Sequence, residues 1–505
     1  MKSWKSFACL SLTLLLIVLS ACSNGNKEEE SHGSQETQSG SSSQEPATEL
    51  NMAYYIFTGT PKDLDLVQDA VNEHLKEKLN VKLKLIPIAF GEYEQKMNLM
   101  LTSNEKLDLV VSSSHFGFDS KVAKGQFQPL DELIEKYGQH ITEVVDPDVL
   151  DASKVNGERY GVPTMRDQAS WLTGLLRTDL IEKYSLDTSN IKQLADLEPL
   201  LKTVKDNEGY APFIGSARGA LMFDALGDVN FIGVLPNYDN DLKVVNAYDL
   251  PEYEAVLKMM RKWYQDGLIP KDAATSKDTA QDLAKANRAF AWTWPGKPGI
   301  AQQESLKASR EVVSFPLNEY PAITTASAQS VMWSIPQQSE HPDKAMQVLD
   351  LLYTDKELID LLNWGIEGKH YVKATDLGDN MIRFPDGVDA TNSGYNINVG
   401  YFWGNQFISY VFEGDDPKLW EEMDNFNKSA LKSKALGFVF DVTPVTTEYA
   451  AVSSVVGQYR NALEVGAVDP EVVLPEFRSR LKEAGVDKII AEKQKQLDAW
   501  AQANK

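Results

Sequence analysis

Aromatic and polar side chains lie close together in a stretch that contains two glycines. The stretch NWGIEGKHY carries Trp364, Glu367, His370 and Tyr371, and its glycines indicate an irregular turn after a helix. Flat rings beside fixed hydrogen-bonding groups suit a ligand with apolar faces and polar edges, such as a sugar. These four residues are therefore candidate ligand contacts, and the alternative for His370 is a structural residue with satisfied hydrogen bonds.

Two further stretches combine the same residue types. Trp403 and Asn405 lie in GYFWGNQF, an aromatic patch between glycines. Arg166 and Asp167 lie in TMRDQAS, which is followed directly by Trp171, and both could form hydrogen bonds with hydroxyl groups. The alternative for Arg166 and Asp167 is a structural ion pair.

Composition and motifs exclude several other kinds of site. The chain has 50 basic and 73 acidic residues, for a net charge of −23, and its basic residues are scattered, so nucleic acid is not an expected partner. The six histidines form no H-x-x-x-H pair for zinc, and no G-x-S-x-G motif of a serine esterase is present. We expect no metal, no cofactor and no catalytic residue, and a monomer.

The elements that position the candidate residues begin with a strand at residues 49–57. Helical spacing follows over 63–80, and period-two alternation over 81–90 indicates a second strand. A further helix pattern at 91–105 leads into LDLVVSSS, a run typical of a buried parallel strand. The order is therefore βαβαβ, which predicts an α/β protein with a parallel sheet.

Ligands of such sheets bind beyond the carboxyl ends of the strands. The loops at residues 57–60 and 112–115 lie at these ends. Their candidate contacts are Phe57, Ser113, Ser114 and His115.

Later segments alternate between helices and short strands. KVNGERYGVP predicts a hairpin that turns at Asn-Gly. RAFAWTW predicts a strand that is broken by Pro295-Gly296, and SVMWSIP predicts another strand. A helix pair is expected to begin at His341-Pro342, and the last residues are strongly helical.

The amino terminus has the features of an export signal. Lys2 and Lys5 precede an apolar run that is too short for a confident membrane span, and Leu-Ser-Ala precedes Cys22. This order resembles the lipobox of bacterial lipoproteins, which implies that Cys22 is lipidated and becomes the first residue. An ordinary secretory signal cut near Ala21 is the alternative.

The segment after the cysteine is polar and contains no aromatic residue. It cannot bury enough apolar surface to fold, so it reads as a flexible tether. We expect a signal peptide at residues 1–21, a lipid-anchored tether at 22–48, and a globular body on the extracellular face of the cell membrane. The membrane would be contacted through the lipid only.

The ordered segments of the body resemble the family 1 extracellular solute-binding proteins of ABC importers, which include maltose-binding protein. The most telling are LDLVVSSSHFG, VNGERYGVPT, RAFAWTWPGKPG and SIPQQSEHPDKAMQVLDLLYTDKELIDLLNWG. RTDLIEKYSLD, LADLEPLLKTVKDNE and the ending ALGFVFDVTPVTTEYAAVSSVVGQYRNALEVGAVDP are closest to the large LipO-like (LplA-type) Gram-positive lipoproteins. The resemblance covers nearly all of the body.

The resemblance implies an α/β, two-lobed, periplasmic-binding-protein-like fold of type II with discontinuous lobes and a multi-segment hinge. The N-terminal lobe would take residues 49–165 and about 328–390, and the C-terminal lobe 166–327 and about 391–505. Some relatives carry a calcium loop of alternating Asp and Asn, whereas this chain has KDNEGYAP there, so no calcium is expected.

The resemblance also assigns ligand contacts. The loop after the third strand maps onto Ser113, Ser114 and His115, and the segment around Pro-Gly maps onto Trp292, Trp294 and Lys297. Strand alternation puts Trp292 and Trp294 on one face, so we expect both to face the ligand or both to pack inward.

The implied function is capture of an oligosaccharide between the lobes and delivery to the permease subunits of an ABC transporter. Two alternatives stay open. A membrane-anchored glycoside hydrolase needs two carboxylates that flank a cleft, and 73 acidic residues make chance pairs common. A peptide-binding lipoprotein of the same fold is only mildly disfavoured by the aromatic content.

Overall fold

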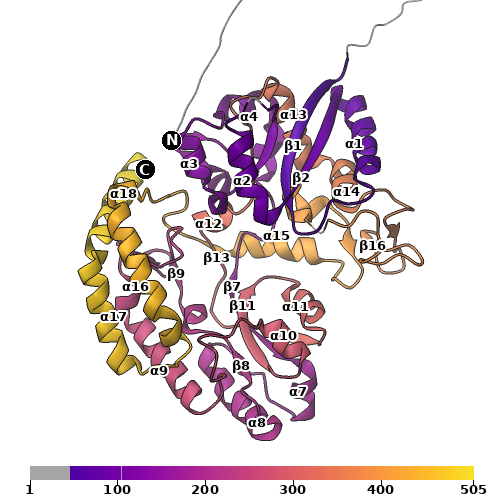
Figure 1. Ribbon diagram of the computed structural model, residues 1–505. Coiled ribbons are helices and arrows are strands. Elements are labelled where there is room, and N and C mark those ends of the chain that lie inside the picture. The colour runs from indigo at the N-terminus through magenta and orange to yellow at the C-terminus, as the bar shows by residue number, and fades with distance from the viewer. Residues whose placement is uncertain (1–45, 104, 398, 505) are drawn as a thin grey trace, which may run out of the picture. The chain divides into compact units, whose positions relative to one another are not determined.

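Five strands form the first sheet of the computed structural model, which describes residues 46–504 apart from 104 and 398 (Figure 1). The strand order is β2-β1-β3-β14-β6, in which β1 pairs in parallel with β2 and β3, and β14 returns antiparallel to β3. The predicted βαβαβ order is therefore confirmed. The strands are β1 (Thr48–Ile56), β2 (Val81–Ala89), β3 (Leu109–Ser112), β6 (Val162–Pro163) and β14 (Met332–Ser334).

Helices with one apolar face cover this sheet. In the first helix Leu64, Val67, Val71 and Leu75 are buried at helical spacing, and Asn80 ends the helix in the left-handed conformation. The helix pair expected after His341 is present, and its second helix contacts the helix that begins at Leu64 (Figure 1). These helices are α1 (Leu64–Leu79), α2 (Phe90–Met100), α3 (Phe118–Ala123), α4 (Asp131–Tyr137), α5 (Gln139–Val144), α6 (Pro147–Asp151), α13 (Pro342–Thr354) and α14 (Lys356–Trp364).

The second sheet has the order β12-β7-β11-β8. β7 is antiparallel to β11 and β12, and β8 is parallel to β11. Helices α7 to α11 come from the same part of the chain. The elements are β7 (Trp171–Arg177), β8 (Phe213–Ile214), β11 (Ala291–Gly296), β12 (Val312–Pro316), α7 (Thr178–Lys183), α8 (Glu198–Glu208), α9 (Pro251–Gln265), α10 (Ala280–Lys285) and α11 (Ile300–Ala308).

The predicted break at Pro295-Gly296 is wrong, because β11 continues through both residues. β8 pairs only with Ala291 and Trp292, so Pro295 has a neighbouring strand on one side alone. Proline is tolerated at such an edge because its missing N–H leaves no ladder bond unmade there. The hairpin at Asn156-Gly157 is confirmed, with β4 (Lys154–Val155) and β5 (Glu158–Arg159) flanking two residues of positive φ.

Two hydrophobic cores accompany the two sheets. The first core draws on residues between Leu50 and Val162 and again between Val331 and Trp403. The second core draws on residues between Leu176 and Leu317 and again between Val445 and Ile489. Each core is therefore built from separate stretches of the chain.

Several crossing segments are held together by backbone and amide hydrogen bonds. Ser170 and Ala322 exchange two backbone hydrogen bonds of 3.1 and 2.9 Å. The Asn427 amide accepts hydrogen bonds from the backbone N–H groups of Gln168 and Ala169 and donates to the carbonyl oxygen of Arg166. The elements here are β13 (Ala322–Ile323), α12 (Thr325–Ala328), α15 (Leu419–Ser429) and β18 (Leu431–Lys432).

The strongly helical ending is also confirmed. α16 (Thr446–Glu464), α17 (Pro470–Ala484) and α18 (Val486–Ala503) pack against one another, and α16 and α17 contact α9 (Figure 1). None of the helices within the described residues is long and apolar enough to cross a membrane. Short strands complete the fold: β9 (Phe223–Asp224), β10 (Leu235–Pro236), β15 (Val372–Lys373), β16 (Met381–Arg383) and β17 (Val411–Phe412).

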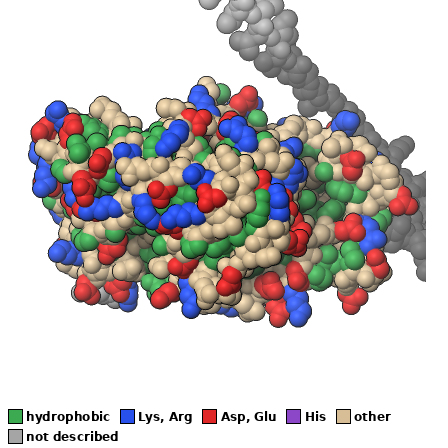
Figure 2. Space-filling view, turned by 90° about the horizontal axis from the view of Figure 1, so that it is seen from below, with side chains coloured by type: hydrophobic (Ala, Val, Ile, Leu, Met, Phe, Trp, Pro, Cys, Tyr) green, Lys and Arg blue, Asp and Glu red, His purple; other side chains and the backbone are tan. Residues whose placement is uncertain are grey.

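Charged side chains of both signs are interspersed over the face drawn in Figure 2. This distribution agrees with the scattered basic residues of the sequence. Cys22 and the predicted signal peptide lie outside the described residues, and so does the predicted tether up to residue 45.

Candidate functional site

A cavity of about 1280 Å³ lies at one edge of the second sheet. β7 begins at this edge, and β8, β11 and β12 end there, because β7 runs antiparallel to its neighbours. Residues before and within the start of β7, near the end of β11, and after β8 and β12 line the cavity. We call it the sheet-edge cavity, and it exceeds the usual range for small-ligand pockets of about 300 to 1,000 Å³.

Two of the predicted aromatic contacts line the sheet-edge cavity. Trp294 is 42% exposed, and Trp171 is half-buried with its ring 4.8 Å from Phe426 in an edge-to-face contact. The register of β11 and β7 pairs Gly296 with Trp171, and a Cβ on Gly296 would lie 2.4 Å from the Trp171 indole. Glycine therefore leaves the space that the Trp171 ring occupies.

Trp292 is packed differently from Trp294. It is fully buried, and its indole N–H lies 3.4 Å from Oε2 of Glu304 on α11. Trp294 also faces α11, with the Lys307 amino group 5.7 Å from its ring centroid. The expectation that both rings share one environment is wrong, because Trp292 packs in a cluster with Leu283 of α10 and Ala308 of α11, and Trp294 does not belong to that cluster.

The sheet-edge cavity also contains polar and aromatic residues that sequence reasoning missed. Asn318 accepts a hydrogen bond from the Leu172 N–H at 2.8 Å, and the Arg218 guanidinium lies 4.8 Å from the ring centroid of Phe231. Glycines and aromatic residues in FIGSARGALMFDALGDVNFIG could have indicated an irregular binding segment. Other missed lining residues are Lys192, Gln193, Phe223, Tyr238 and Glu319.

A row of three rings lies at the carboxyl ends of the parallel strands of the first sheet. Phe57 follows β1 and is 61% exposed, and its ring stacks on Phe90 at 4.9 Å. Phe90 follows β2 and stacks on His115, which follows β3, at 5.9 Å and 13°. Sequence reasoning named Phe57 and His115 but missed Phe90, which its position at the end of the second predicted strand could have indicated. We call these rings the aromatic row.

The two serines beside His115 differ in exposure. Ser113 is buried, and its Oγ accepts a hydrogen bond from the His115 N–H at 3.1 Å. Ser114 is half-buried and lines a cavity of about 240 Å³ that also contacts Asp119, Gly227 and Tyr449. Burial raises the pKa of Asp119 to about 6.

Arg166, Asp167 and Lys297 form one ion cluster. Arg166 Nε donates to Asp167 Oδ1 at 2.6 Å, Lys297 donates to Asp167 Oδ2, and the Arg166 guanidinium lies 4.7 Å from the Tyr401 ring centroid. Burial would raise the pKa of Asp167, but the charges and hydrogen bonds of Arg166 and Lys297 outweigh it and hold this pKa below its ordinary value. The structural ion pair considered above is therefore present.

Trp364 joins this cluster at a small cavity of about 120 Å³ that Asp167 and Lys297 also line. The indole N–H of Trp364 donates to Ser409 Oγ at 2.8 Å. Glu367 is exposed and lies 3.4 Å from Lys373. The structure thus brings Trp364 to Asp167 and Lys297, and leaves Glu367 at the surface.

The remaining candidates are buried. His370 is 2% exposed, its Nδ1 accepts from the Ile366 N–H at 2.9 Å, and its Nε2 lies 3.0 Å from Asp63. Tyr371, Trp403 and Asn405 are also buried, and Trp403 stacks on Trp333 at 6.1 Å. These contacts fit the structural alternative given for His370. Asn405 is also hydrogen-bonded, from its Nδ2 to the Tyr353 carbonyl oxygen at 3.3 Å, whereas the buried indole N–H of Trp403 has no hydrogen-bond partner among the described residues.

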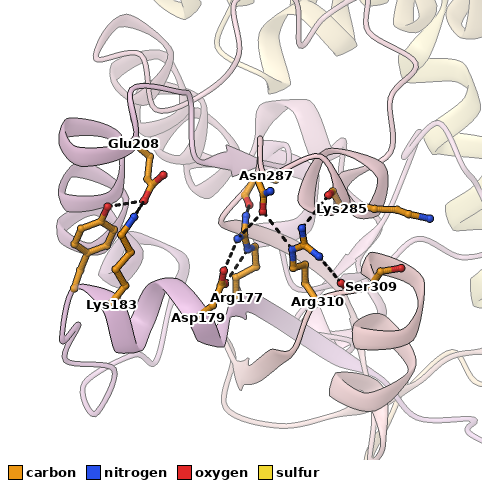
Figure 3. A network of polar contacts seen from close by, with 10 residues as sticks. Arg177, Asp179, Lys183, Glu208, Lys285, Asn287, Ser309 and Arg310 are labelled. Carbon is orange, nitrogen blue, oxygen red and sulfur yellow. Dashed lines mark hydrogen bonds and ion pairs between the residues drawn. The ribbon is translucent and has the colours of Figure 1, made fainter.

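The opposite end of β7 carries a separate polar network (Figure 3). Arg177 donates to Asp179 at 2.6 and 3.0 Å and to Asn287 at 3.0 Å, and Arg310 Nε donates to Asn287 at 3.2 Å. These groups satisfy one another and tie α7 to the turn after α10. Among the described residues no group of three or more His, Cys, Asp or Glu side chains could hold a metal ion.

Comparison with protein families gives two matches. Residues 36–358 match the family described as bacterial extracellular solute-binding protein. Residues 434–502, which include α16 to α18, match a domain of unknown function, DUF3502. The predicted resemblance to solute-binding proteins is confirmed.

Individual relatives agree with this match. A carbohydrate ABC transporter substrate-binding protein of Streptococcus pneumoniae serotype 4 is 29% identical over 524 residues, with both chains fully covered. Lipoprotein LipO of Bacillus subtilis is 24% identical over 404 residues, covering 73% of each chain.

A solved structure confirms the predicted fold class. The N-glycan transport solute binding protein of Streptococcus pneumoniae is 27% identical and has a TM-score of 0.81, covering 91% of this chain and 100% of that chain. The TM-score is 0.66 for the same protein in complex with Man5GlcNAc.

Proposed function

The chain belongs to the bacterial extracellular solute-binding proteins, and we propose that it captures an oligosaccharide in a cleft between two lobes and delivers it to an ABC transporter. Members of this family are non-catalytic components of transporters. The sugar is therefore bound and released without chemical change. Specificity comes from stacked rings and from hydrogen bonds to hydroxyl groups.

The observation that carries the proposal is the sheet-edge cavity with Trp171 and Trp294 in its wall. An aromatic face can stack on the apolar face of a sugar ring, and Asn318, Gln193 and Glu319 offer amide and carboxylate groups to its hydroxyls. A volume of about 1280 Å³ favours several sugar rings over one. The aromatic row supplies a second stacking surface on the first sheet.

Lobe closure is the step that couples binding to transport. We assign the lobes as residues 49–165 with about 328–390, and 166–327 with about 391–505. The residue ranges that build the two cores support this assignment. The first core extends beyond the assigned range, as far as Trp403. The TM-score is 0.81 to the structure of the N-glycan transport protein for which no sugar is named and 0.66 to its Man5GlcNAc complex, and this difference supports an open form that closes on sugar.

Attachment to the membrane completes the proposal. Lipidation of Cys22 holds the protein at the extracellular face of the cell membrane, and the polar tether lets it reach the permease subunits. The similarity to lipoprotein LipO supports this arrangement.

Calorimetry on the chain without residues 1–22 tests the proposal. We expect saturable binding of Man5GlcNAc or of another oligosaccharide in a panel that includes fructo-oligosaccharides, and no binding of peptides. Chromatography of the same mixtures would detect cleavage. Failure of every oligosaccharide to bind, or release of products from any of them, would contradict the proposal.

A further inference from the structure

We propose that α18 braces one wall of the sugar site, with Lys493 as a positioning residue, which gives the carboxyl-terminal domain of unknown function a role in ligand binding. The wall is the connection at residues 225–245, called here the wall loop. Ala225, Phe231 and Tyr238 from this loop line the sheet-edge cavity. The inference rests on the proposed function where it concerns sugar.

The wall loop has an unusual backbone. Bulky residues rarely adopt positive φ, yet Leu226, Phe231 and Leu242 have φ of 51°, 58° and 58°. Such conformations persist only where the surrounding structure holds them, and they cluster at functional sites. The other non-glycine residues of positive φ in this loop are Asn237, Tyr238, Asn240 and Asp241.

Lys493 lies under this loop without any exposed surface. Its amino group donates to Asp228 Oδ2 at 3.1 Å, to the Gly233 carbonyl oxygen at 3.1 Å and to the Ile232 carbonyl oxygen. Gly233 has a φ of 86°, and a Cβ there would lie 3.1 Å from Lys493 Cδ, so the loop backbone and the lysine stem are in close contact. One buried amino group thus links the Asp228 side chain to two consecutive backbone carbonyls of the loop.

Asp228 extends the brace to α16. Its Oδ1 accepts hydrogen bonds from Tyr449 Oη at 2.8 Å and from the Asn230 N–H at 2.8 Å. Two helices of the carboxyl-terminal domain therefore hold the same loop aspartate.

The rest of the α18 face supports the same loop. Gln494 accepts from the Val244 N–H at 2.7 Å and donates to the Leu242 carbonyl oxygen at 3.0 Å. The same face of α18 also carries apolar residues, at helical spacing from Lys493 and Gln494, and they pack in one cluster with loop residues. These apolar residues are Ile490, Leu497 and Trp500. The loop residues of this cluster are Leu226, Leu235, Leu242 and Val244.

The buried charge of Lys493 indicates a role other than stabilising the fold. Apolar residues of similar volume in place of a buried ion pair are often neutral or stabilising, so the pair is a weak device for stability alone. An ammonium that caps two loop carbonyls does fix the loop in one geometry. The placement of Phe231 and Tyr238 at the cavity depends on that geometry.

The test compares variants of the full mature chain with the parent. Lys493→Met removes the brace. Lys493→Met combined with Asp228→Asn also removes the unpaired carboxylate that the single change leaves buried. Leu349→Ala in α13 is the control for lost stability, because Leu349 is fully buried in the first core and belongs to a different cluster.

Hydrogen exchange of peptides from residues 225–245 and calorimetry with Man5GlcNAc are the two readouts. We expect Lys493→Met to raise exchange in the wall loop and to weaken sugar binding, each at least tenfold. The double variant regains melting temperature but recovers neither property. Leu349→Ala lowers the melting temperature but changes neither wall-loop exchange nor sugar affinity. Lys488→Met, at an exposed lysine of α18, changes neither of these two readouts.

Three results would overturn the inference. These are wall-loop exchange in Lys493→Met that is no faster than in Leu349→Ala, recovery of sugar affinity in the double variant, or unchanged affinity in Lys493→Met. If Lys493→Met does not fold, Gln494→Leu removes two bonds to the loop without burying a charge and should raise loop exchange severalfold. If the parent chain binds no oligosaccharide, the proposed function fails, and loop exchange alone decides the brace.

Discussion

Trp292 and Trp294 lie two residues apart on β11 and both face α11, but only Trp294 reaches the sheet-edge cavity. Trp292 lies next to Glu304 and has no exposed surface, whereas Trp294 is 42% exposed near Lys307. One face of β11 therefore lies in the core at Trp292 and lines the sheet-edge cavity at Trp294. Substitutions at the two positions should separate stability from binding.

Trp294→Ala should weaken sugar binding about tenfold, which corresponds to about 1.4 kcal/mol, because a stacking surface is lost. Its free energy of unfolding should change by less than about 0.5 kcal/mol. Trp292→Ala should lower the free energy of unfolding by about 3 to 5 kcal/mol, since it leaves a cavity in the core. Calorimetry measures the sugar affinity, and urea unfolding measures the free energy of unfolding. If Trp292→Ala and Trp294→Ala lose the same sugar affinity under conditions in which both variants are folded, the assignment is contradicted.

Gly296→Ala should disturb the site through Trp171. The added Cβ would lie 1.6 Å from Thr173 Oγ1 and 2.4 Å from the Trp171 indole, so both side chains have to shift from their positions beside Gly296. We expect a loss of about 1 to 3 kcal/mol in the free energy of unfolding, as for overpacked positions, and weaker sugar binding. Gly457→Ala, at an exposed position of α16 where the Cβ meets nothing within 4 Å, is the control.

Phe57→Ala tests whether the aromatic row contributes to the same site. Phe57 is 61% exposed, so its loss should hardly change stability, while sugar affinity should fall about three- to tenfold. Leu99→Ala removes another exposed apolar side chain and should leave affinity unchanged. Binding of Man5GlcNAc that is insensitive to Phe57→Ala would restrict the site to the second sheet.

The sequence predicts single helices and strands well, but it predicts poorly which distant segments of the chain lie side by side. The spacing of apolar residues identifies β1, α1, β2, α2 and β3 because each pattern lies within a single element. The end of β11 is different, since whether Pro295 ends a strand depends on β8 pairing only with Ala291 and Trp292. A neighbouring strand from another part of the chain decides that outcome.

The candidate site shows the same division. Trp171 is identifiable from the polar segment that precedes it, and Trp294 from the family resemblance. The separation of Trp294 from buried Trp292 depends on α10 and α11, whose residues Leu283 and Ala308 pack in one cluster with Trp292. Arg218 and Tyr238 lie among 3₁₀ turns and two-residue strands with no period to reveal them. Both residues line the sheet-edge cavity together with strand residues from distant parts of the chain.

Lys297→Met should destabilise the fold by about 3 kcal/mol near pH 7, because Asp167 keeps a buried charge with one partner fewer. The pKa of Asp167 is held below its ordinary value, so its contribution to stability is present above the unfolded-state pKa and is lost as the pH falls through the folded-state pKa. Without Lys297 that loss should begin at a higher pH.

Urea unfolding of Lys297→Met between pH 7 and pH 3 measures this shift. Lys418→Met, at an exposed lysine, serves as the control. Parallel acid profiles for Lys297→Met and the parent chain would show that Asp167 does not depend on Lys297.

Glu464 should make the protein less stable as the pH rises. Burial raises the pKa of Glu464 to about 7 against the nearby charges of Arg460 and Arg218, and the side chain is 4% exposed next to Tyr253. Between pH 4.5, its ordinary pKa, and pH 7 the folded state binds more protons than the unfolded state, so the free energy of unfolding falls as the pH increases. The contribution is fully present below this window and is lost above it.

Glu464→Gln should remove this decline, which amounts to about 3 kcal/mol for a pKa raised by between two and three units. Urea unfolding at pH 5 and pH 8 measures it: the variant should gain stability over the parent at pH 8 and differ little at pH 5, since glutamine resembles the neutral acid. Glu483→Gln, at an exposed glutamate of α17, controls for the general change in net charge. If the parent and Glu464→Gln lose the same stability between these two pH values, Glu464 is ionised in the folded protein throughout, and burial does not govern its titration.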